Sequence, residues 1–418
     1  MKISYATSDI TPTTGMALAG YGKRTQSSTS TYSQLEVNGI LLSAEPRRVA
    51  ILSVDALYVG EAVISRIRTE LKELGTADQL EILFCASHTH FAPQLDPAKP
   101  ILGSVDLAYL DFFVHRTTLL LRKLLSARPE QTTLYLGTAP CHAAVNRRRY
   151  GWRPHSRPPF WRKELMILPN EHGAGDPRVT CIMLKGENQR PQAVIWSFAC
   201  HPVGGHDTLA VSSDFPGYVR DRIRERADDP QLPVLFLQGF SGTLRPRATS
   251  LKGTSIRTKI NHLINRPVFG RFTESQYVEW CDSIWHSVDV GIKGAEPSHD
   301  TPCRFTSAAL PLQDIIPGAD PRSVVTFFNV TLSRSTSFLC ATAEVAAEWL
   351  PMLRDELGRT HFVCVGCVNV VFEYLPTSQM VSEKGYEAGG FFPAFSLRGR
   401  FGPDLDRLVL DAISELMH

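Results

Sequence analysis

Residues 84–93 read Phe84-Cys85-Ala86-Ser87-His88-Thr89-His90-Phe91-Ala92-Pro93 and follow an apolar run that begins at Leu80. The run predicts a buried strand that ends in a polar loop. Because side chains two residues apart on an extended chain point to the same side, His88 and His90 are expected to project together beyond the strand end. Neutral imidazoles are ligands that zinc accepts, so the stretch indicates a metal site. Taken alone, the pair fits equally well with one core histidine and one exposed histidine.

The composition describes a core-forming protein of balanced charge. The chain has 418 residues, of which 43% are hydrophobic, and this is enough for a large core. Lys and Arg number 44 and Asp and Glu 42, so the chain as a whole is not a polyanion-binding protein. No apolar run reaches the ~18–20 residues of a membrane span. Residues 1–6 also lack the apolar region of a secretory signal.

The nine cysteines form no disulfide or zinc framework in the sequence. Most of them lie inside apolar runs, and the pair Cys364 and Cys367 has no second CxxC to complete a four-sulfur site. Buried, reduced thiols are typical of cytoplasmic proteins. We therefore expect a cytoplasmic location.

Apolar strands alternate with amphipathic helices along the chain. The first unit is a strand at 49–54, a helix at 62–74 and the strand before His88. Later strands are expected at 179–184, 193–200, 324–332 and 361–372, with a helix over 343–357. No repeat or low-complexity linker separates these elements. The pattern predicts an α/β fold, with a mixed, largely buried β-sheet core flanked by helices, as a single domain over residues 1–418.

Side chains able to bind a metal recur where the predicted strands stop. His201 follows the strand at 193–200, Glu344 stands at a strand-to-helix junction, and Tyr374 follows the strand at 361–372. Ligand sites in α/β folds gather at strand ends. Together with His88, these residues predict a metal site at the strand ends.

Two basic stretches raise the question of a nucleic-acid partner. Residues 146–163 mix arginines with aromatic side chains, which would suit single-stranded nucleic acid. Three prolines there favour a loop at the rim of a pocket for an anionic or amphiphilic small molecule. Residues 245–271 contain basic but no acidic side chains, a pattern more typical of a solvated insertion than of a binding arm. Nucleic acid is therefore not the favoured partner.

These motifs resemble those of the neutral/alkaline (non-lysosomal) ceramidases and their shorter ceramidase-like relatives, over nearly the full length. The family's Ser-His-Thr-His is similar to Ser87–His90, its Asn-Arg to Asn146-Arg147, its central zinc histidine to His201, and its Pro-Gly-Glu to Thr342-Ala343-Glu344. Its tyrosine ligand is followed twelve residues later by Tyr-Glu-Gly-Ala. Tyr374 and Tyr386-Glu387-Ala388-Gly389 reproduce that spacing, which is the most specific match.

The resemblance implies a catalytic zinc ion (Zn2+) held by His88, His201, Glu344 and Tyr374. Such a ligand set leaves zinc open to a water molecule, as in catalytic rather than structural sites. The resemblance also places His90, Arg147 and Tyr386 around the reacting carbonyl. There His90 would pass a proton to the leaving amine, and Arg147 and Tyr386 would donate to the oxyanion.

One turn departs from the family pattern. Where the family has Gly-Asp/Asn-x-Ser-Pro, this chain has Gly242-Thr243-Leu244-Arg245-Pro246, so Arg245 replaces a serine beside the substrate. An arginine there suggests a carboxylate or phosphate on the substrate, and we expect Gly242 and Arg245 to bind substrate. The sequence also lacks the secretion signal and the C-terminal immunoglobulin-like domain of the true ceramidases. Ceramide itself is therefore not the expected substrate.

Three hypotheses follow. The first is a zinc-dependent amidohydrolase that cleaves an N-acyl or cyclic amide of a soluble, anionic small molecule. The second is amide formation or acyl transfer at the same zinc site in a biosynthetic pathway. The third is a non-catalytic protein that binds nucleic acid through its basic stretches. Metal content separates the third from the others, and product analysis separates the first two. Nothing in the sequence specifies an oligomeric state.

Overall fold

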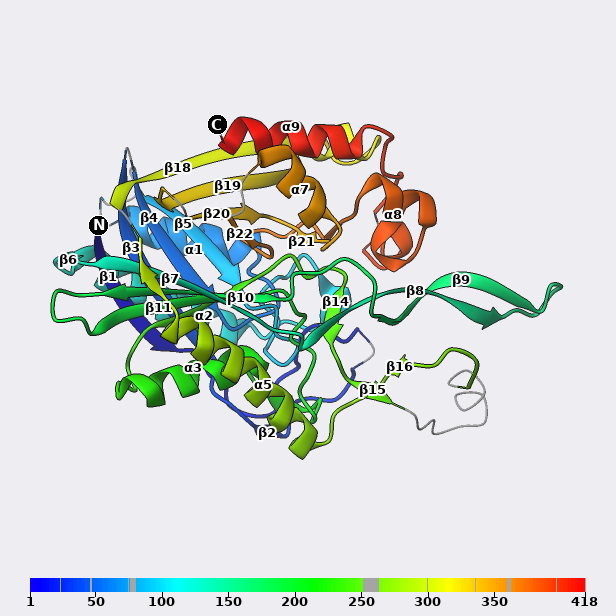
Figure 1. Ribbon diagram of the computed structural model, residues 1–418, viewed down its shortest axis with the longest axis horizontal. Helices are drawn as coiled ribbons and strands as arrows, with labels where there is room; N and C mark the ends of the chain where they lie inside the picture. The colour runs from blue at the N-terminus through cyan, green and yellow to red at the C-terminus, as the bar shows by residue number, and fades with distance from the viewer. Residues whose placement is uncertain are drawn as a thin grey trace.

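The computed structural model describes residues 1–22, 24–45, 47–73, 75, 80–250, 263–298, 300–334, 336–358, 362–395 and 397–417. Within these residues, most strands belong to a nine-stranded sheet and a five-stranded sheet (Figure 1). Short elements connect and extend them: β2 Ser30–Thr31, β12 Ala210–Val211, β15 Thr249–Ser250, β16 Val268–Phe269, η2 Pro100–Leu102, α6 Leu312–Ile315, α8 Ser378–Glu383 and η3 Tyr386–Gly390.

The larger sheet has the order β22-β20-β19-β18-β3-β1-β6, and β4 pairs with both β3 and β5. Its strands are β1 Lys2–Asp9, β3 Glu36–Glu45, β4 Arg48–Val54, β5 Leu80–Ala86, β6 Glu130–Gln131, β18 Asp300–Pro311, β19 Val324–Ser333, β20 Thr336–Ala341 and β22 Phe362–Val365. The pairs β4/β5 and β20/β22 are parallel, whereas β3/β4 and β19/β20 are antiparallel. The sheet is therefore mixed, as the sequence predicts.

The smaller sheet packs face to face against the larger one. It has the order β13-β11-β10-β7-β17. Its strands are β7 Thr133–Pro140, β10 Arg178–Lys185, β11 Pro191–Phe198, β13 Val234–Gln238 and β17 Glu296–Pro297. Ile51 and Leu83 of the larger sheet share one buried cluster with Ile195 and Leu235 of the smaller sheet. Burying these side chains between the sheets stabilises the sandwich through the hydrophobic effect.

Helices cover the outer face of each sheet, which gives four layers. The larger sheet carries α1 Glu61–Lys72, α2 Leu107–Ser126, α7 Trp349–Leu357 and α9 Leu405–Met417, and the smaller sheet carries α3 Asp214–Ala227 and α5 Glu274–Lys293. Figure 1 shows α7 and α9 on one outer side and α3 and α5 on the other. The predicted α/β fold, with a buried sheet core flanked by helices, is confirmed. Among the described residues, no helix combines the length and the apolar character needed to cross a membrane.

Two predicted elements around the strand ends are wrong. The segment 343–357 is not helical from its start: Glu344–Val345 forms β21, and the helix begins at Trp349. The predicted strand at 361–372 is only the short β22, because Cys367 (φ 56°) and Asn369 (φ 53°) adopt left-handed backbone that a strand does not accommodate. The chain then forms β23 Tyr374–Leu375, which pairs in parallel with β21.

The stretch 146–163 is a hairpin rather than the predicted rim loop. Strand β8 Ala144–Pro154 pairs antiparallel with β9 Trp161–Asn170, and β14 Leu244–Pro246 pairs with the base of β8. The prolines are compatible with this, because Pro154 ends β8 and Pro158 and Pro159 lie in the turn, where no ladder hydrogen bond is lost. The hairpin projects from the body of the molecule (Figure 1). Of the second basic stretch, 251–262 lie outside the described residues.

Candidate metal centre

Two buried histidines lie beyond the carboxyl ends of strands from different sheets. His88 follows β5 of the larger sheet and His201 follows β11 of the smaller sheet. Their ring centroids are 4.8 Å apart, although the residues are far apart in sequence. His88 has a φ of 66°, a left-handed conformation that costs a non-glycine residue about 1–3 kcal/mol. Such strain persists where the surrounding structure holds it, and it is common at functional sites.

Hydrogen bonds fix the orientation of both rings. The Nδ1 of His88 donates to the carbonyl of Leu57 at 3.1 Å, and the Nδ1 of His201 donates to the carbonyl of Ser241 at 2.8 Å. Because a carbonyl oxygen can only accept, each Nδ1 carries the proton and each Nε2 keeps its lone pair. Metal-binding histidines are held in this way. Burial lowers the pKa of His88 to about 4, so its ring stays neutral.

The carboxylate of Glu344 faces both lone pairs. Its Oε2 lies 3.5 Å from the Nε2 of His88 and 3.1 Å from the Nε2 of His201, and its Oε1 accepts a hydrogen bond from the hydroxyl of Tyr58. Among the described residues, the His88 Nε2 and the Glu344 Oε2 have no hydrogen-bond partner. Three converging electron-pair donors repel one another unless a cation lies among them, so this donor set fits a metal ion such as zinc.

His90 is the third histidine of the cluster. The nitrogen donors of His88, His90 and His201 lie within 4.8 Å of one another. Neither ring nitrogen of His90 has a hydrogen-bond partner among the described residues, and no carbonyl fixes its tautomer. The pKa of His90 lies well below its ordinary value, mainly because the ring is buried and to a lesser extent because His88 and His201 are close. His90 is therefore near enough to contribute to a metal site, beside the role of proton carrier that the sequence predicts.

Tyr374, Arg147 and Tyr386 approach the cluster from another side. The β21/β23 register puts Tyr374 directly opposite Glu344. The guanidinium carbon of Arg147 lies 5.4 Å from the centroid of the Tyr374 ring. The ring centroids of Tyr374 and Tyr386 are 5.5 Å apart. The Nε of Arg147 donates to the Oε1 of Glu387 at 2.6 Å. The buried Nη2 of Arg147 has no hydrogen-bond partner within the part of the chain that the structure describes. Burial alone would lower the pKa of Arg147, but Tyr374 and Glu387 raise it.

One cavity of about 230 Å³ brings nearly all of the predicted residues together. Its lining includes His88, His90, Arg147, His201, Arg245, Glu344, Tyr374 and Tyr386. Gly242 is not among the lining residues. Its amide donates to the carbonyl of Val345 at 2.8 Å, so this N–H group is not available to a bound molecule. The geometry thus gives no support to a substrate-binding role for Gly242.

Arg245 contributes an unpaired positive charge to this cavity. It lies on β14 rather than in a solvated insertion, and its guanidinium carbon is 4.9 Å from the ring centroid of Phe269. Among the described residues, its side chain has no hydrogen bond or ion pair. Burial lowers the pKa of Arg245, and the nearby Arg147 lowers it further. A desolvated guanidinium without a partner is an electrostatic site for an anion.

Sequence reasoning missed three acidic or phenolic side chains of the site. Tyr58 donates to Glu344, Glu387 bridges Arg147 and Arg148, and Glu373 lines the cavity next to Tyr374. Burial raises the pKa of Glu373 to about 8, against the opposing effect of Lys99, with which it is paired. Tyr58 could have been predicted because it follows the strand at 49–54. Glu387 could have been predicted because it belongs to the Tyr-Glu motif that begins at Tyr386.

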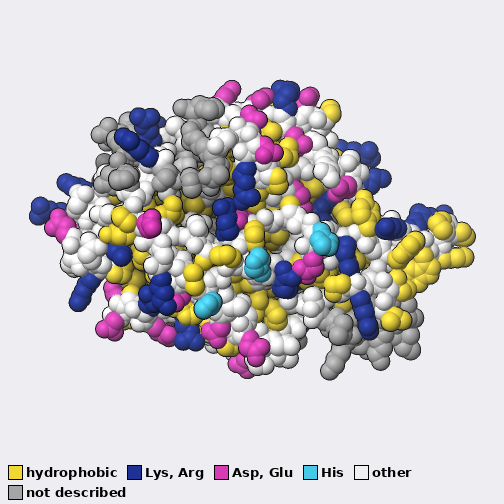
Figure 2. Space-filling view, viewed as in Figure 1, with side chains coloured by type: hydrophobic (Ala, Val, Ile, Leu, Met, Phe, Trp, Pro, Cys, Tyr) yellow, Lys and Arg dark blue, Asp and Glu magenta, His cyan; other side chains and the backbone are white. Residues whose placement is uncertain are grey.

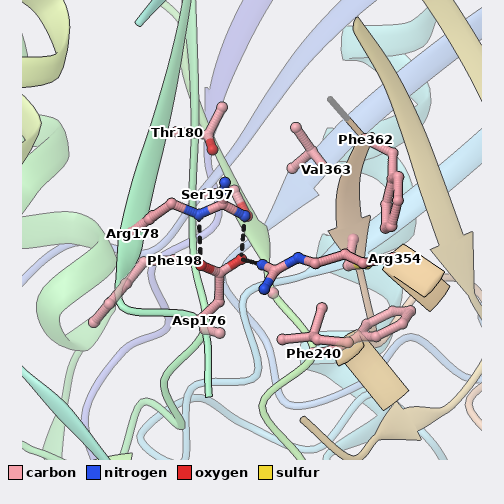
Figure 3. A pocket seen from close by; sticks show the side chains of 13 residues that line it. Asp176, Arg178, Thr180, Ser197, Phe198, Phe240, Arg354, Phe362 and Val363 are labelled. Atoms are coloured by element: carbon pink, nitrogen blue, oxygen red, sulfur yellow. Dashed lines mark hydrogen bonds and ion pairs between the residues drawn. The ribbon is translucent and has the colours of Figure 1, made fainter. Parts of the chain in front are cut away.

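A second, much smaller cavity shows no such chemistry. It has a volume of about 30 Å³ and lies between β10 and the segment around α7. Figure 3 shows that the carboxylate of Asp176 accepts from both Arg178 and Arg354 in this cavity. Its charged groups are therefore mutually satisfied, and its volume suits a water molecule rather than a substrate.

Comparison with known proteins identifies the fold. No protein-family model matches the chain, and no curated protein matches it in sequence. Among solved structures, the neutral ceramidase from Pseudomonas aeruginosa matches with a TM-score of 0.72 and 15% identity, over 100% of this chain and 74% of the other. A structure described as ceramidase complexed with C2 matches with a TM-score of 0.75 and 13% identity, over the same shares of the two chains. The resemblance that the motifs predicted is confirmed at the level of the fold: over its whole length, this chain has the neutral ceramidase fold.

Proposed function

We propose that the protein is a zinc-dependent amidohydrolase that cleaves an N-acyl or cyclic amide bond of an anionic small molecule. The observation that carries the proposal is the convergence of the His88 Nε2, the His201 Nε2 and the Glu344 Oε2 in a cavity that also holds Arg147. The shared fold with neutral ceramidases supports the same chemistry.

In this proposal, His88, His201, Glu344 and Tyr374 hold the zinc. When bound, zinc lowers the pKa of a water molecule to roughly 7 and polarises a carbonyl group. The outer hydrogen bonds to Leu57 and Ser241 keep the two imidazoles aimed at the centre.

The remaining groups act on the substrate. The unpartnered nitrogens of His90 are suited to take up a proton and to give it to the leaving amine. The Nη2 of Arg147 and the hydroxyl of Tyr386 are donors for the oxyanion that develops on the carbonyl oxygen. Because Glu387 already holds Arg147 in place, this donor needs little rearrangement during the reaction.

The test of this proposal combines metal content with product analysis. Protein purified without chelator is expected to carry one zinc per chain and to hydrolyse N-acyl amino acids, which are anionic N-acyl amides. Chelator should abolish hydrolysis, and added zinc should restore it. Net amide formation from the free acid and amine would instead favour the biosynthetic alternative. Metal-free protein that binds oligonucleotides would contradict both.

Arg245 gives a prediction about the substrate charge. We expect Arg245→Ser to raise KM for an N-acyl amino acid by roughly 10- to 150-fold with zinc retained, because a hydrogen bond to a charged group contributes about 1.5–3 kcal/mol. The matching N-acyl amino acid amide, which lacks the carboxylate, should show little change in KM.

Arg247→Ser is the matched control for this measurement. Arg247 lies two residues further on, but it pairs with Glu171 outside the candidate site. Its replacement should leave KM unchanged for both compounds. An equal loss for the charged and the neutral compound in Arg245→Ser would show that Arg245 does not recognise the carboxylate.

The cysteines support the cytoplasmic location that we propose for the protein. All nine are free and buried. Burial raises the pKa of each thiol, as for Cys181, where it reaches about 12. Such thiols behave as small apolar side chains and form no disulfide framework.

A further inference from the structure

The β8/β9 hairpin exposes aromatic side chains that the described residues leave uncovered. Near the end of β8, Asn265 accepts a hydrogen bond from the amide of Trp152 at 2.7 Å and donates one to the carbonyl of Trp152 at 2.9 Å. Beyond this point the hairpin is a two-stranded ribbon. Tyr150, Trp152, Phe160 and Trp161 are 39–60% exposed. A lone two-stranded ribbon is marginally stable in water, and clustered exposed aromatic rings mark an interaction surface. We call residues 150–163 the hairpin arm.

The hairpin arm is also positively charged. It carries Arg153, Arg157, Arg162 and Lys163 and no acidic residue. The nearest carboxylate, Glu164, is already occupied by His155 at 2.7 Å and Arg153 at 3.4 Å. Figure 2 shows basic and apolar side chains gathered together at this projecting end. The charge of the arm therefore favours an anionic partner.

We infer that the hairpin arm docks on an anionic lipid surface. Tryptophan and tyrosine rings prefer the boundary between headgroups and hydrocarbon, and arginine and lysine beside them contact lipid phosphates. The free edges of a two-stranded ribbon carry N–H and C=O groups without partners, which cannot enter hydrocarbon. The arm is therefore expected to lie in the headgroup layer and not to cross it.

Aliphatic neighbours favour a lipid partner over single-stranded nucleic acid. Ile167 on β9 is 44% exposed, and Leu263 and Ile264, which precede Asn265, are 67% and 43% exposed. Protein surfaces that bind single-stranded nucleic acid use aromatic side chains to stack on the bases, and aliphatic side chains contribute little to that contact. A lipid surface accommodates both kinds of side chain.

The arm is connected directly to the candidate metal centre. Strand β8 carries Arg147 into the cavity, and Ile167 of β9 lines the same cavity. A strand rises about 3.3 Å per residue, so Pro154 at the end of β8 lies on the order of 20 Å from Arg147. Docking would hold the cavity close to the lipid headgroups. This inference concerns where the protein works and does not depend on the amidase chemistry.

The experiment is co-sedimentation with vesicles of phosphatidylcholine alone and of phosphatidylcholine with phosphatidylglycerol. The full chain is expected to sediment with the anionic vesicles only, and increasing salt should weaken binding. The double variant Trp152→Ser/Trp161→Ser should bind at least tenfold more weakly, and Arg157→Gln/Arg162→Gln should lose the preference for anionic vesicles. Leu107→Ser is the control, because Leu107 is 73% exposed at the start of α2.

Circular dichroism and zinc content of each variant separate loss of binding from loss of fold. Absence of binding by the wild-type chain, or binding that the arm variants do not change, would overturn the inference. So would a dimer in size-exclusion chromatography that Trp152→Ser/Trp161→Ser dissociates, because the arm would then cover a second copy. Tight binding of single-stranded oligonucleotide that the same variant loses would assign the arm to nucleic acid.

Discussion

His201→Ala is expected to yield a folded protein that has lost its zinc and its hydrolytic activity. The variant removes one of the three electron-pair donors that converge at the centre, and Glu344 loses its nearest nitrogen neighbour. Changing an outer hydrogen-bond partner of a metal ligand typically weakens binding 10- to 100-fold, and removing a ligand itself should exceed about 100-fold. Zinc per chain after dialysis and thermal unfolding, measured on the same sample, check this expectation.

His172→Ala is the control for His201→Ala, because His172 is exposed and lies outside the cavity. It should keep both zinc and activity. Full zinc occupancy in His201→Ala would show that His201 packs in the core and does not bind the metal. If His201→Ala loses both its zinc and its cooperative unfolding transition, Glu344→Gln tests the metal site instead. This change nearly preserves the side-chain volume, so the variant should lose zinc without unfolding the core.

Tyr386→Phe and Tyr374→Phe are expected to differ from each other. If Tyr386 donates to the oxyanion, removing its hydroxyl should lower kcat by roughly 10²–10³ with KM and zinc retained. Tyr374→Phe should lower zinc affinity as well, because a phenyl ring offers no ligand atom. Parallel measurements of zinc occupancy, kcat and KM on the two variants distinguish these roles.

Tyr135→Phe serves as the control for the tyrosine pair. Tyr135 lies on β7, and its hydroxyl donates to Gln189 in the turn between β10 and β11, outside the candidate site. Wild-type behaviour is expected for this variant. If Tyr386→Phe and Tyr374→Phe also behaved like the wild type, both tyrosines would only pack the loop against the core, and the twelve-residue spacing would carry no functional meaning.

The histidines were predictable from the sequence because each follows a continuous apolar run. Such runs identify β5 and β11 by their composition alone, and a polar residue directly after a buried strand lies at a sheet end. The same runs predict cover on both faces of the sheet, since strands apolar on both faces require it, but the second sheet that provides one of these covers was not predicted.

The partners of those histidines could not be placed in the same way. Strands β21 and β23 have two residues each, too few for any periodicity, so the pairing of Glu344 with Tyr374 arises from tertiary packing. The hairpin was missed because its end is exposed on both faces and therefore lacks apolar alternation. The environment of Arg245 depends on Phe269 and Arg147, which only the fold brings near.

The spacing of the donors along the chain also determines when the centre can exist. His88, His201 and Glu344 belong to the N-terminal, middle and C-terminal thirds of the chain, and no short fragment contains all three. During synthesis, the first two histidines leave the ribosome long before the carboxylate that completes the set. Since an unfolded chain rarely holds a preformed metal site, loading with the proposed metal would become the last step of maturation. Protein that terminates before Glu344 would lack one of the three converging donors.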